Sequence, residues 1–479
     1  MTKSPILVWF RRDLRIRDHA ALAAAVATGQ PLIPVYVLDE AAGGAWRMGG
    51  AARWWLHHSL AAHQKALSEI GSHLVLRRGD SAEVLAGLAQ ETGAKALYCS
   101  RCYEPWAGRL EREVRDLLGD RGVEVKRFAG ALLHDPDRLL TKAETPFKVF
   151  TPFWRSLKSG LEVTRPLGAP RGIVSPDRVP DGDDLASWRL LPTRPDWAGG
   201  LRETWMPGEA GARERLAAFV EDRLAAYALM RDRPDREGTS RLSPHLAFGE
   251  VSARQCWWAA KEAARRGEAQ EGLETFLKEL AWREFSAHLL HHAPDLPDAP
   301  FRSEFASFPW REDRAMLRAW QRGMTGYPIV DAGMRELWTT GFMHNRVRMI
   351  AASFLIKHLL QPWQTGEAWF WDTLVDADLA SNAANWQWVA GSGADAAPYF
   401  RIFNPMRQGE TFDPDGDYVR RWVPEIARLP AALIHAPWKA SPDALANAGV
   451  EIGRSYPAPI VDHASGRQAA LDAFATLKG

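Results

Sequence analysis

The sequence predicts an α/β domain with a doubly wound parallel sheet, followed by an all-α domain. Three observations support this fold class. Short β-rich runs alternate strictly with helical runs over residues 1–130, a proline-rich irregular stretch follows, and the rest of the chain has helical periodicity almost throughout. At 479 residues the chain is also too long for one ordinary hydrophobic core.

The first domain is expected over residues 1–130 and is Rossmann-like in its alternation. Its five β-rich runs are PILVWF (5–10), PLIPVYVLD (31–39), HLVLRR (73–78), KALYCS (95–100) and VEVKRF (123–128). Of the helical runs between them, one is closed by Gly71, and another is expected to have Ser81 as its N-cap and to end at Gly93. No strand is followed by G-x-G-x-x-G or G-x-x-x-x-G-K-[ST], so neither dinucleotide nor phosphate binding of those kinds is supported.

Residues 131–205 are expected to form an interdomain connector. They include RPLGAPRGIVSPDRVPDGDD, and a loop of this length inside one compact domain would be unusual. Residues 206–479 then form the helical domain, in which GARERLAAFVEDRLAAYALM and LETFLKELAWREFSAHLLHH are typical helical runs.

The composition is that of a soluble globular protein, with 46% apolar and 25% charged residues. No apolar run of about 18 residues and no signal peptide is present, so we expect no membrane segment and a cytoplasmic protein. Three cysteines argue against a disulfide framework, and we expect no metal site. A net charge of +1 gives by itself no reason to invoke nucleic acid, although a local patch can still be basic.

A loop that leads into a helix is the first candidate binding motif. EGTSRLSPHLAFG (237–249) places Thr239, Ser240 and Ser243 where hydroxyls and free backbone N–H groups favour a phosphate. An ordinary helix cap is the alternative interpretation of this motif.

Two helical motifs carry polar groups beside large apolar ones. KELAWREF (278–285) sets Glu279 and Trp282 on one face, three residues apart, although a buried tryptophan beside a surface ion pair is the alternative. In GFMHNRVRMIAASF (341–354) three side chains share a face of an otherwise apolar helix and must be satisfied by some partner, for which a ligand is one candidate. These three are Asn345, Arg348 and Met349.

The stretch SNAANWQWVAGSGADAAPYF (381–400) combines small residues, which suggest a tight backbone, with two tryptophans and two asparagines. Together with the motifs above, DADLASNAANWQW (376–388) resembles the photolyase/cryptochrome family in order and spacing. The resemblance extends over essentially the whole chain and includes VWFRRDLRIRD (8–18), TGYPIVDAGMR (325–335), MHNRVRMI (343–350) and FRIFNP (400–405). GGAARWWLHHSL (49–60) and YPAPIVDH (456–463) are most similar to the class III bacterial cyclobutane pyrimidine dimer photolyases, which are related to plant cryptochromes.

This resemblance implies an amino-terminal antenna domain and a helical FAD domain, and it assigns cofactor contacts. The expected contacts to the FAD phosphates and ribityl chain are Tyr227, Thr239, Ser240, Arg241, Leu242 and Ser243. The expected surroundings of the isoalloxazine are Arg283, Asn345, Arg348, Asp376, Asp378 and Asn382. The stretch at 381–400 is then interpreted as a crowded turn at the floor of a flavin pocket.

The resemblance also implies a substrate and an electron path. Trp386, Trp363 and Trp310 match the tryptophan chain through which the family photoreduces its flavin, with core packing as the alternative. The expected contacts to DNA that contains a flipped pyrimidine dimer are Arg231, Glu279, Trp282, Asn345, Arg346, Met349, Trp388, Arg401 and Gln408, with Arg407 as a further basic candidate.

Asn382 separates the two branches of the family. Photolyases have asparagine beside flavin N5, whereas plant cryptochromes have aspartate, whose charge would repel an anionic reduced flavin. Asn345 stands where enzymes that repair (6-4) photoproducts have a histidine. The expected function is therefore light-driven repair of cyclobutane pyrimidine dimers by electron transfer from excited reduced FAD, in a monomer that associates with the bacterial nucleoid. A cryptochrome-like blue-light receptor without repair is the alternative, and a nicotinamide-dependent oxidoreductase has no fingerprint here.

The residues at the expected antenna site depart from the pattern of the best-known folate-binding photolyases. Within CYEPWAGRLERE (102–113), Trp106 and Ala107 replace the Asn-Glu pair of the best-known folate-binding photolyases. The class III resemblance still implies 5,10-methenyltetrahydrofolate in a differently lined site, with an 8-hydroxy-deazaflavin or FMN as alternatives. The candidate contacts are Glu40, Trp54 and Trp55.

Overall fold

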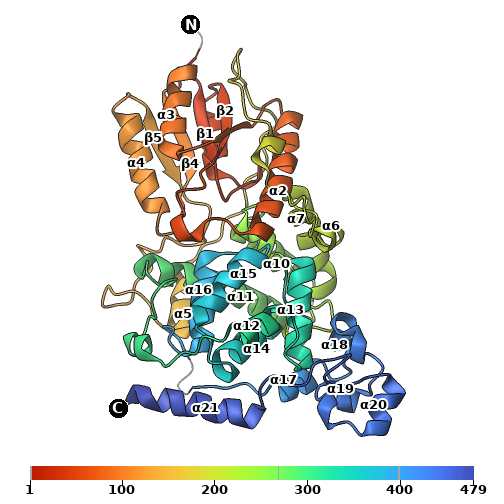
Figure 1. Cartoon of the computed structure of the whole chain (residues 1–479). Helices are drawn as coiled ribbons and strands as arrows, with labels where there is room; N and C mark the ends of the chain where they lie inside the picture. Colours follow the sequence, from red (N-terminus) through yellow and green to blue (C-terminus); the bar gives the residue numbers. More distant parts are fainter. Residues whose placement is uncertain (1–2, 268, 397–399, 479) are drawn as a thin grey trace.

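The computed structural model describes residues 3–267, 269–396 and 400–478. Five parallel strands form one sheet in the order β3-β2-β1-β4-β5, which confirms the predicted fold of the first domain (Figure 1). The strands are β1 (Ile6–Phe10), β2 (Leu32–Leu38), β3 (Val75–Arg78), β4 (Ala96–Ser100) and β5 (Glu124–Phe128). Each lies within its predicted run.

Helices cover both faces of this sheet. They are α1 (Ala20–Ala27), α2 (Gly50–Glu69), α3 (Ser81–Thr92) and α4 (Ala107–Gly119). Because side chains alternate along a strand, Val8 and Phe10 of β1 pack with residues of α1 and α2, whereas Leu7 and Trp9 pack with residues of α3 and α4. The sheet is therefore doubly wound, as predicted.

The start of α3 differs from the prediction by one residue. The N-cap is Asp80, whose carboxylate accepts hydrogen bonds from the N–H groups of Ala82 and Glu83 at 3.0 Å. Ser81 is the first helical residue, and its hydroxyl instead donates to the Asp39 carboxylate at 3.0 Å. A carboxylate in the first turn is also favoured by the helix dipole, which explains why the aspartate takes the cap.

The predicted connector carries helices of its own. They are α5 (Phe150–Gly160), η2 (Leu185–Trp188) and α6 (Gly199–Thr204). Helix α5 packs on the helical half, where Phe153 lies 5.1 Å from Phe285 between ring centroids. The connector is therefore partly built into the second core, and the domain boundaries at 130 and 205 stay predictions.

In the rest of the described chain the regular secondary structure is helical, apart from an isolated bridge between Ile452 and Tyr456. Its helices are α7 (Glu209–Ala218), α8 (Tyr227–Met230), α9 (Ser243–Ala247), α10 (Ala253–Ala264), α11 (Gln270–His292), α12 (Arg314–Gln321), α13 (Pro328–Thr340), α14 (Asn345–Ser353), α15 (Trp363–Thr373), α16 (Leu379–Ala390), α17 (Pro405–Phe412), α18 (Asp417–Trp422), α19 (Ala431–Ile434), α20 (Pro442–Ala448) and α21 (His463–Ala475). Short 3-10 or π segments are η1 (Gly44–Trp46), η3 (Phe219–Arg223), η4 (Ser303–Ser307), η5 (Phe354–His358), η6 (Pro424–Ile426), η7 (Pro437–Lys439) and η8 (Thr476–Lys478). Within the residues that the structure describes, no helix is long and apolar enough to cross a membrane.

The two halves meet along the carboxyl ends of β1 and β4 (Figure 1). Trp55 of α2 donates its indole N–H to the Glu250 carboxylate at 3.0 Å, and Arg15 donates to the Gly249 carbonyl at 2.9 Å. Trp54 and Trp55 are almost fully buried in the first core. Their burial leaves little indole surface for a ligand, and their role as contacts of an antenna chromophore stays a prediction.

Candidate active site

The segment before α9 forms a compact turn. Arg241 has a left-handed backbone conformation, with a φ of 49°, and its guanidinium lies 3.7 Å from the buried Glu336 carboxylate. Leu242 is buried, whereas Ser243 is exposed as the first residue of α9. Thr239 is half-buried beside them. The segment thus presents hydroxyl groups at a short helix entry, as the motif predicts.

Tyr227 lies in the core beneath this segment. Its ring contacts Phe219 and Phe276 edge-on, at centroid distances of 5.4 and 5.8 Å. Burial raises the pKa of its hydroxyl well above the usual range. The residue is therefore mostly a packing group, and a contact to a cofactor would use its small exposed part.

A charged loop precedes α16. Arg348 of α14 donates to Asp376 Oδ2 at 2.8 Å and to the Met343 carbonyl at 2.7 Å. The other oxygen of this carboxylate, Asp376 Oδ1, is buried and has no hydrogen-bond partner among the described residues. A buried acceptor without a donor is costly, so this atom fits a donor group of a bound ligand.

Asp378 is the N-cap of α16 and accepts a hydrogen bond from the Ser381 N–H at 2.8 Å. Burial by itself would raise the pKa of its carboxyl, but the guanidinium groups of Arg12 and Arg283 lower it below the usual value. Arg283 also donates to the Ala131 carbonyl at 3.1 Å. Arg283 of α11 and Arg348 of α14 are thus both close to the loop before α16, through Asp378 and Asp376 respectively.

Asn382 lies one turn further along α16. Its Nδ2 donates to the backbone carbonyl of Glu367 in α15 at 3.0 Å, and no described residue donates to its Oδ1. The amide therefore has a free acceptor, which suits the N5–H group of a reduced flavin. The stretch interpreted as a crowded turn is in fact a helix as far as Ala390, and only the following Gly391 begins the turn. Its small residues allow close packing of α16 on α15 rather than a tight backbone.

Glu367, whose backbone carbonyl accepts from Asn382, has a second feature that the sequence did not predict. Its carboxyl group is completely buried, and neither oxygen has a hydrogen-bond partner in the described parts of the chain. Burial raises the pKa of this carboxyl well above its usual range, which favours its neutral form.

The predicted substrate residues form an ion-paired cluster. Arg231 is ion-paired with Glu279 of α11, and Arg346 donates to the Asp232 carboxylate at 2.7 Å. Burial raises the pKa of Glu279, although Arg231 opposes this effect. Both arginines were predicted to contact DNA phosphates, and both already have a carboxylate partner. Asp232 is a member of this cluster that the motifs did not reveal.

Trp282 is stacked on Phe150 of α5, with ring centroids 3.7 Å apart and an angle of 6° between the planes. One face of this indole is therefore covered by the connector. The remaining predicted contacts are less buried: Asn345, Arg401 and Arg407 are exposed, and Met349, Trp388 and Gln408 are half-buried. They lie on α14, α16, α17 and the chain that leads to α17.

The three predicted electron-transfer tryptophans differ in burial. Trp386 and Trp363 are 3% and 1% exposed, whereas Trp310 is half-buried. Trp386 contacts Phe370 edge-on at a centroid distance of 5.0 Å and Trp320 at 6.3 Å. Of the three, Trp310 is thus the one that reaches solvent, and their order as an electron path stays a prediction.

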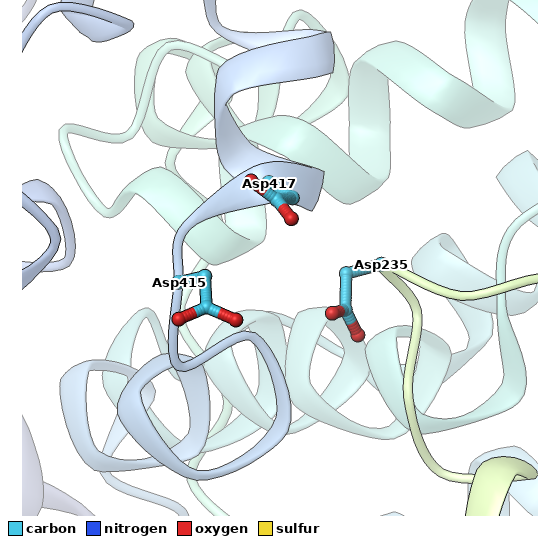
Figure 2. Close-up of side chains that lie close together, drawn as sticks. All are labelled: Asp235, Asp415 and Asp417. Carbon is cyan, nitrogen blue, oxygen red and sulfur yellow. The ribbon is translucent and has the colours of Figure 1, made fainter.

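An acidic cluster lies apart from these residues. The carboxylates of Asp235, Asp415 and Asp417 converge at the start of α18 (Figure 2). Arg233 donates two hydrogen bonds to Asp235, and Arg236 lies 3.7 and 3.8 Å from the other two carboxylates. Two guanidinium groups thus already supply cations to this cluster.

The comparisons with known proteins agree with this arrangement. A model of the FAD binding domain of DNA photolyase matches residues 276–476, and a DNA photolyase model matches residues 6–171. A deoxyribodipyrimidine photo-lyase of Agrobacterium fabrum is 52% identical over 475 residues, which cover 99% of this chain and 98% of that one. Cryptochrome-1 of Arabidopsis thaliana is 39% identical, over 95% of this chain and 68% of the relative.

A solved structure extends this similarity to three dimensions. The crystal structure of a bacterial class III photolyase from Agrobacterium tumefaciens has a TM-score of 0.97 and 52% identity, and the match covers 100% of this chain and 98% of that one. The whole-chain identity, both domain matches and the fold lead to one conclusion. The chain belongs to the photolyase/cryptochrome family and is similar to its class III photolyases.

Proposed function

We propose that this protein is a light-driven DNA photolyase that repairs cyclobutane pyrimidine dimers. The observation that carries the proposal is the amide of Asn382, which is tied to the Glu367 carbonyl through Nδ2 and keeps Oδ1 free. A neutral acceptor at this position tolerates an anionic reduced flavin, whereas a carboxylate would repel it. The 52% identity to a deoxyribodipyrimidine photo-lyase supports the same activity.

The residues that would hold FAD fit its two ends. Thr239, Ser240 and Ser243 offer hydroxyls to the phosphates, and the unpaired Asp376 Oδ1 offers an acceptor to the flavin end. When bound, reduced FAD supplies the electron that opens the cyclobutane ring after light absorption, and it takes that electron back. The indoles of Trp386, Trp363 and Trp310 would provide the electron that first reduces the flavin.

The dimer would be held by the cluster on α11, α14, α16 and α17. Trp282 would offer the indole face that Phe150 does not cover, and Trp388 would provide a second apolar surface. Glu279 and Asn345 would hydrogen-bond the polar edges of the pyrimidines. A dimer is already poorly stacked, so moving it out of the duplex should cost less than flipping a normal base.

The exposed basic residues would contact the DNA backbone. Arg401 and Arg407 are free of carboxylate partners within the described residues, so they are better phosphate candidates than the ion-paired Arg231 and Arg346. We propose that the protein acts as a monomer on nucleoid DNA in the cytoplasm.

We propose 5,10-methenyltetrahydrofolate as the antenna, on the basis of the similarity to class III photolyases. Of the candidate contacts, Trp54 and Trp55 are almost fully buried, and Glu40 is ion-paired with Arg53 and Arg78. Acid release and chromatography of the bound chromophores would identify it. A deazaflavin or FMN in place of the folate would contradict this part of the proposal.

The activity can be tested with two oligonucleotides, one with a cyclobutane thymine dimer and one with a (6-4) photoproduct. Blue light should restore thymine absorbance in the first and leave the second unchanged, because Asn345 stands in the place of the (6-4) histidine. A protein whose flavin is demonstrably reduced, but which repairs neither lesion, would instead be a blue-light receptor.

A further inference from the structure

Arg12 crosses from the sheet half into the helical half. It belongs to the motif VWFRRDLRIRD and is the second residue after the end of β1. Its Nε donates to the Ala247 carbonyl at 2.8 Å, and its Nη2 donates to the Ala377 carbonyl at 2.9 Å. Its Nη1 lies 3.5 Å from the Glu104 carboxylate of its own domain. One guanidinium therefore joins three segments.

The two carbonyls that Arg12 holds lie next to the proposed FAD contacts. Ala247 is the last residue of α9, the helix that begins at Ser243. Ala377 stands between Asp376 and Asp378, in the loop that precedes Asn382. Both alanines are at least 94% buried, at 6% and 5% exposure, so water is a poor substitute for the guanidinium at these carbonyls.

Arg12 also places a positive charge near Asp378, in the loop that precedes α16. Arg12, Arg283 and Asp378 line one cleft between the two halves, together with the ends of β1 and β4. The two guanidinium groups lower the pKa of Asp378 in spite of its burial, so the carboxylate at the start of α16 stays ionised. The sheet domain thus supplies part of the electrostatic environment of the flavin loop.

We propose that Arg12 is a positioning residue for FAD, supplied by the domain that does not contain the flavin. It holds the loop around Asp376 and Asp378 and the end of α9 in their FAD-binding arrangement. This inference rests on the proposed function, because it takes those two segments to be flavin contacts. Lysine cannot replace arginine fully, since an ammonium lacks the planar fork that reaches two carbonyls in fixed directions.

A second interdomain contact provides a matched control. Arg254 of α10 is ion-paired with Asp18 of the sheet domain, and Asp18 also accepts a hydrogen bond from Ser252 at 2.5 Å. This contact joins the same two halves but touches neither α9 nor the loop before α16. Its loss should weaken the docking of the domains without a specific effect on FAD.

The experiment compares the holoprotein with R12Q, R12K and R254Q. The FAD dissociation constant is measured by the fluorescence of released flavin, the midpoint potential of the bound flavin by redox titration, and the Tm by calorimetry. We expect R12Q to bind FAD at least tenfold more weakly and to have a more negative potential. R12K keeps the charge, so it should restore the potential more fully than the affinity. R254Q should change FAD affinity by less than twofold while lowering the Tm.

The outcomes separate this inference from the proposed function. Equal weakening of FAD binding in R12Q and R254Q would show that Arg12 only docks the domains, and unchanged binding and potential in R12Q would also overturn the inference. If R12Q does not fold, R12K decides: wild-type affinity in that variant would contradict the role of the fork. A wild-type protein that binds FAD but repairs no dimer would refute the photolyase proposal and leave this test intact.

Discussion

The side-chain amide of Asn382 has one used and one unused hydrogen-bonding group. Asn382 donates from Nδ2 to the Glu367 carbonyl, and its Oδ1 accepts no hydrogen bond from any described residue. The acid that carries this carbonyl is itself buried, and burial raises the pKa of its carboxyl well above the usual range, which favours the neutral form.

We predict that Asn382→Asp makes the fully reduced, anionic flavin harder to reach under illumination with a thiol donor. A like charge in a buried site typically shifts a titration by about one to three units, or roughly 1.4–4 kcal/mol. The visible spectrum during illumination measures this. Asn385→Asp, an exposed residue on the same helix, is the control and should behave as wild type. A variant that bleaches as completely as the wild type would remove Asn382 from the flavin.

A second prediction concerns the electron path. Trp386→Phe should block photoreduction of oxidised FAD but spare repair by chemically reduced enzyme, because the indole supplies the electron and takes no part in ring opening. Trp320→Phe removes a buried neighbour at 6.3 Å and should retain photoreduction. Photoreduction at the wild-type rate in Trp386→Phe would require another donor, and Trp363 and Trp310 would lose their roles with it.

At the scale of elements, the close approach of α15 and α16 positions both Asn382 and Trp386. Gly366 of α15 lies directly under the Trp386 ring, where an added Cβ would be 2.1 Å from Cη2. The helices can approach this closely only because one of them has no side chain there. The glycine therefore serves packing rather than a turn.

Gly366→Ala should consequently destabilise the protein. Overpacking of a core costs about 1–3 kcal/mol, and the displaced indole should also slow photoreduction. Calorimetry and the rate of flavin reduction measure both effects. Gly87→Ala in α3 is the control, because its added Cβ would have no other heavy atom within 4 Å. This variant should stabilise the folded protein by about 0.5–1 kcal/mol. A Tm at or above the wild-type value in Gly366→Ala would contradict the packing shown here.

The elements also show what a sequence can predict. Every strand and the end of α3 at Gly93 follow from local patterns, because alternation and left-handed glycines act over a few residues. The contacts of Trp282 with Phe150 and of Arg231 with Glu279 join residues far apart in the chain. Helical periodicity identifies the buried face of a helix but not its partner, so Phe150, Asp232 and Arg12 could not be found in this way.

For the whole molecule, electrostatics acts locally rather than through the total charge. The net charge is only +1, so DNA binding must depend on a basic region near the site. We predict that Arg401→Gln and Arg407→Gln each weaken binding to dimer-containing duplex and each lower the slope of log affinity against log salt by about 0.9. Titrations at several salt concentrations measure this. Arg121→Gln, exposed in the sheet domain, should leave the slope unchanged.

The stack between Phe150 and Trp282 has a consequence for anyone who wishes to shorten this protein. A fragment cut at residue 206 would retain every helix from α7 onward, yet it would lack the ring that covers one face of Trp282. Such an aromatic contact contributes about 0.5–1.5 kcal/mol beyond its buried area, and its loss would expose the indole face that Phe150 covers. The smallest autonomous unit therefore includes α5, and gene fusions or domain exchanges should place their junction before Phe150 rather than after the connector.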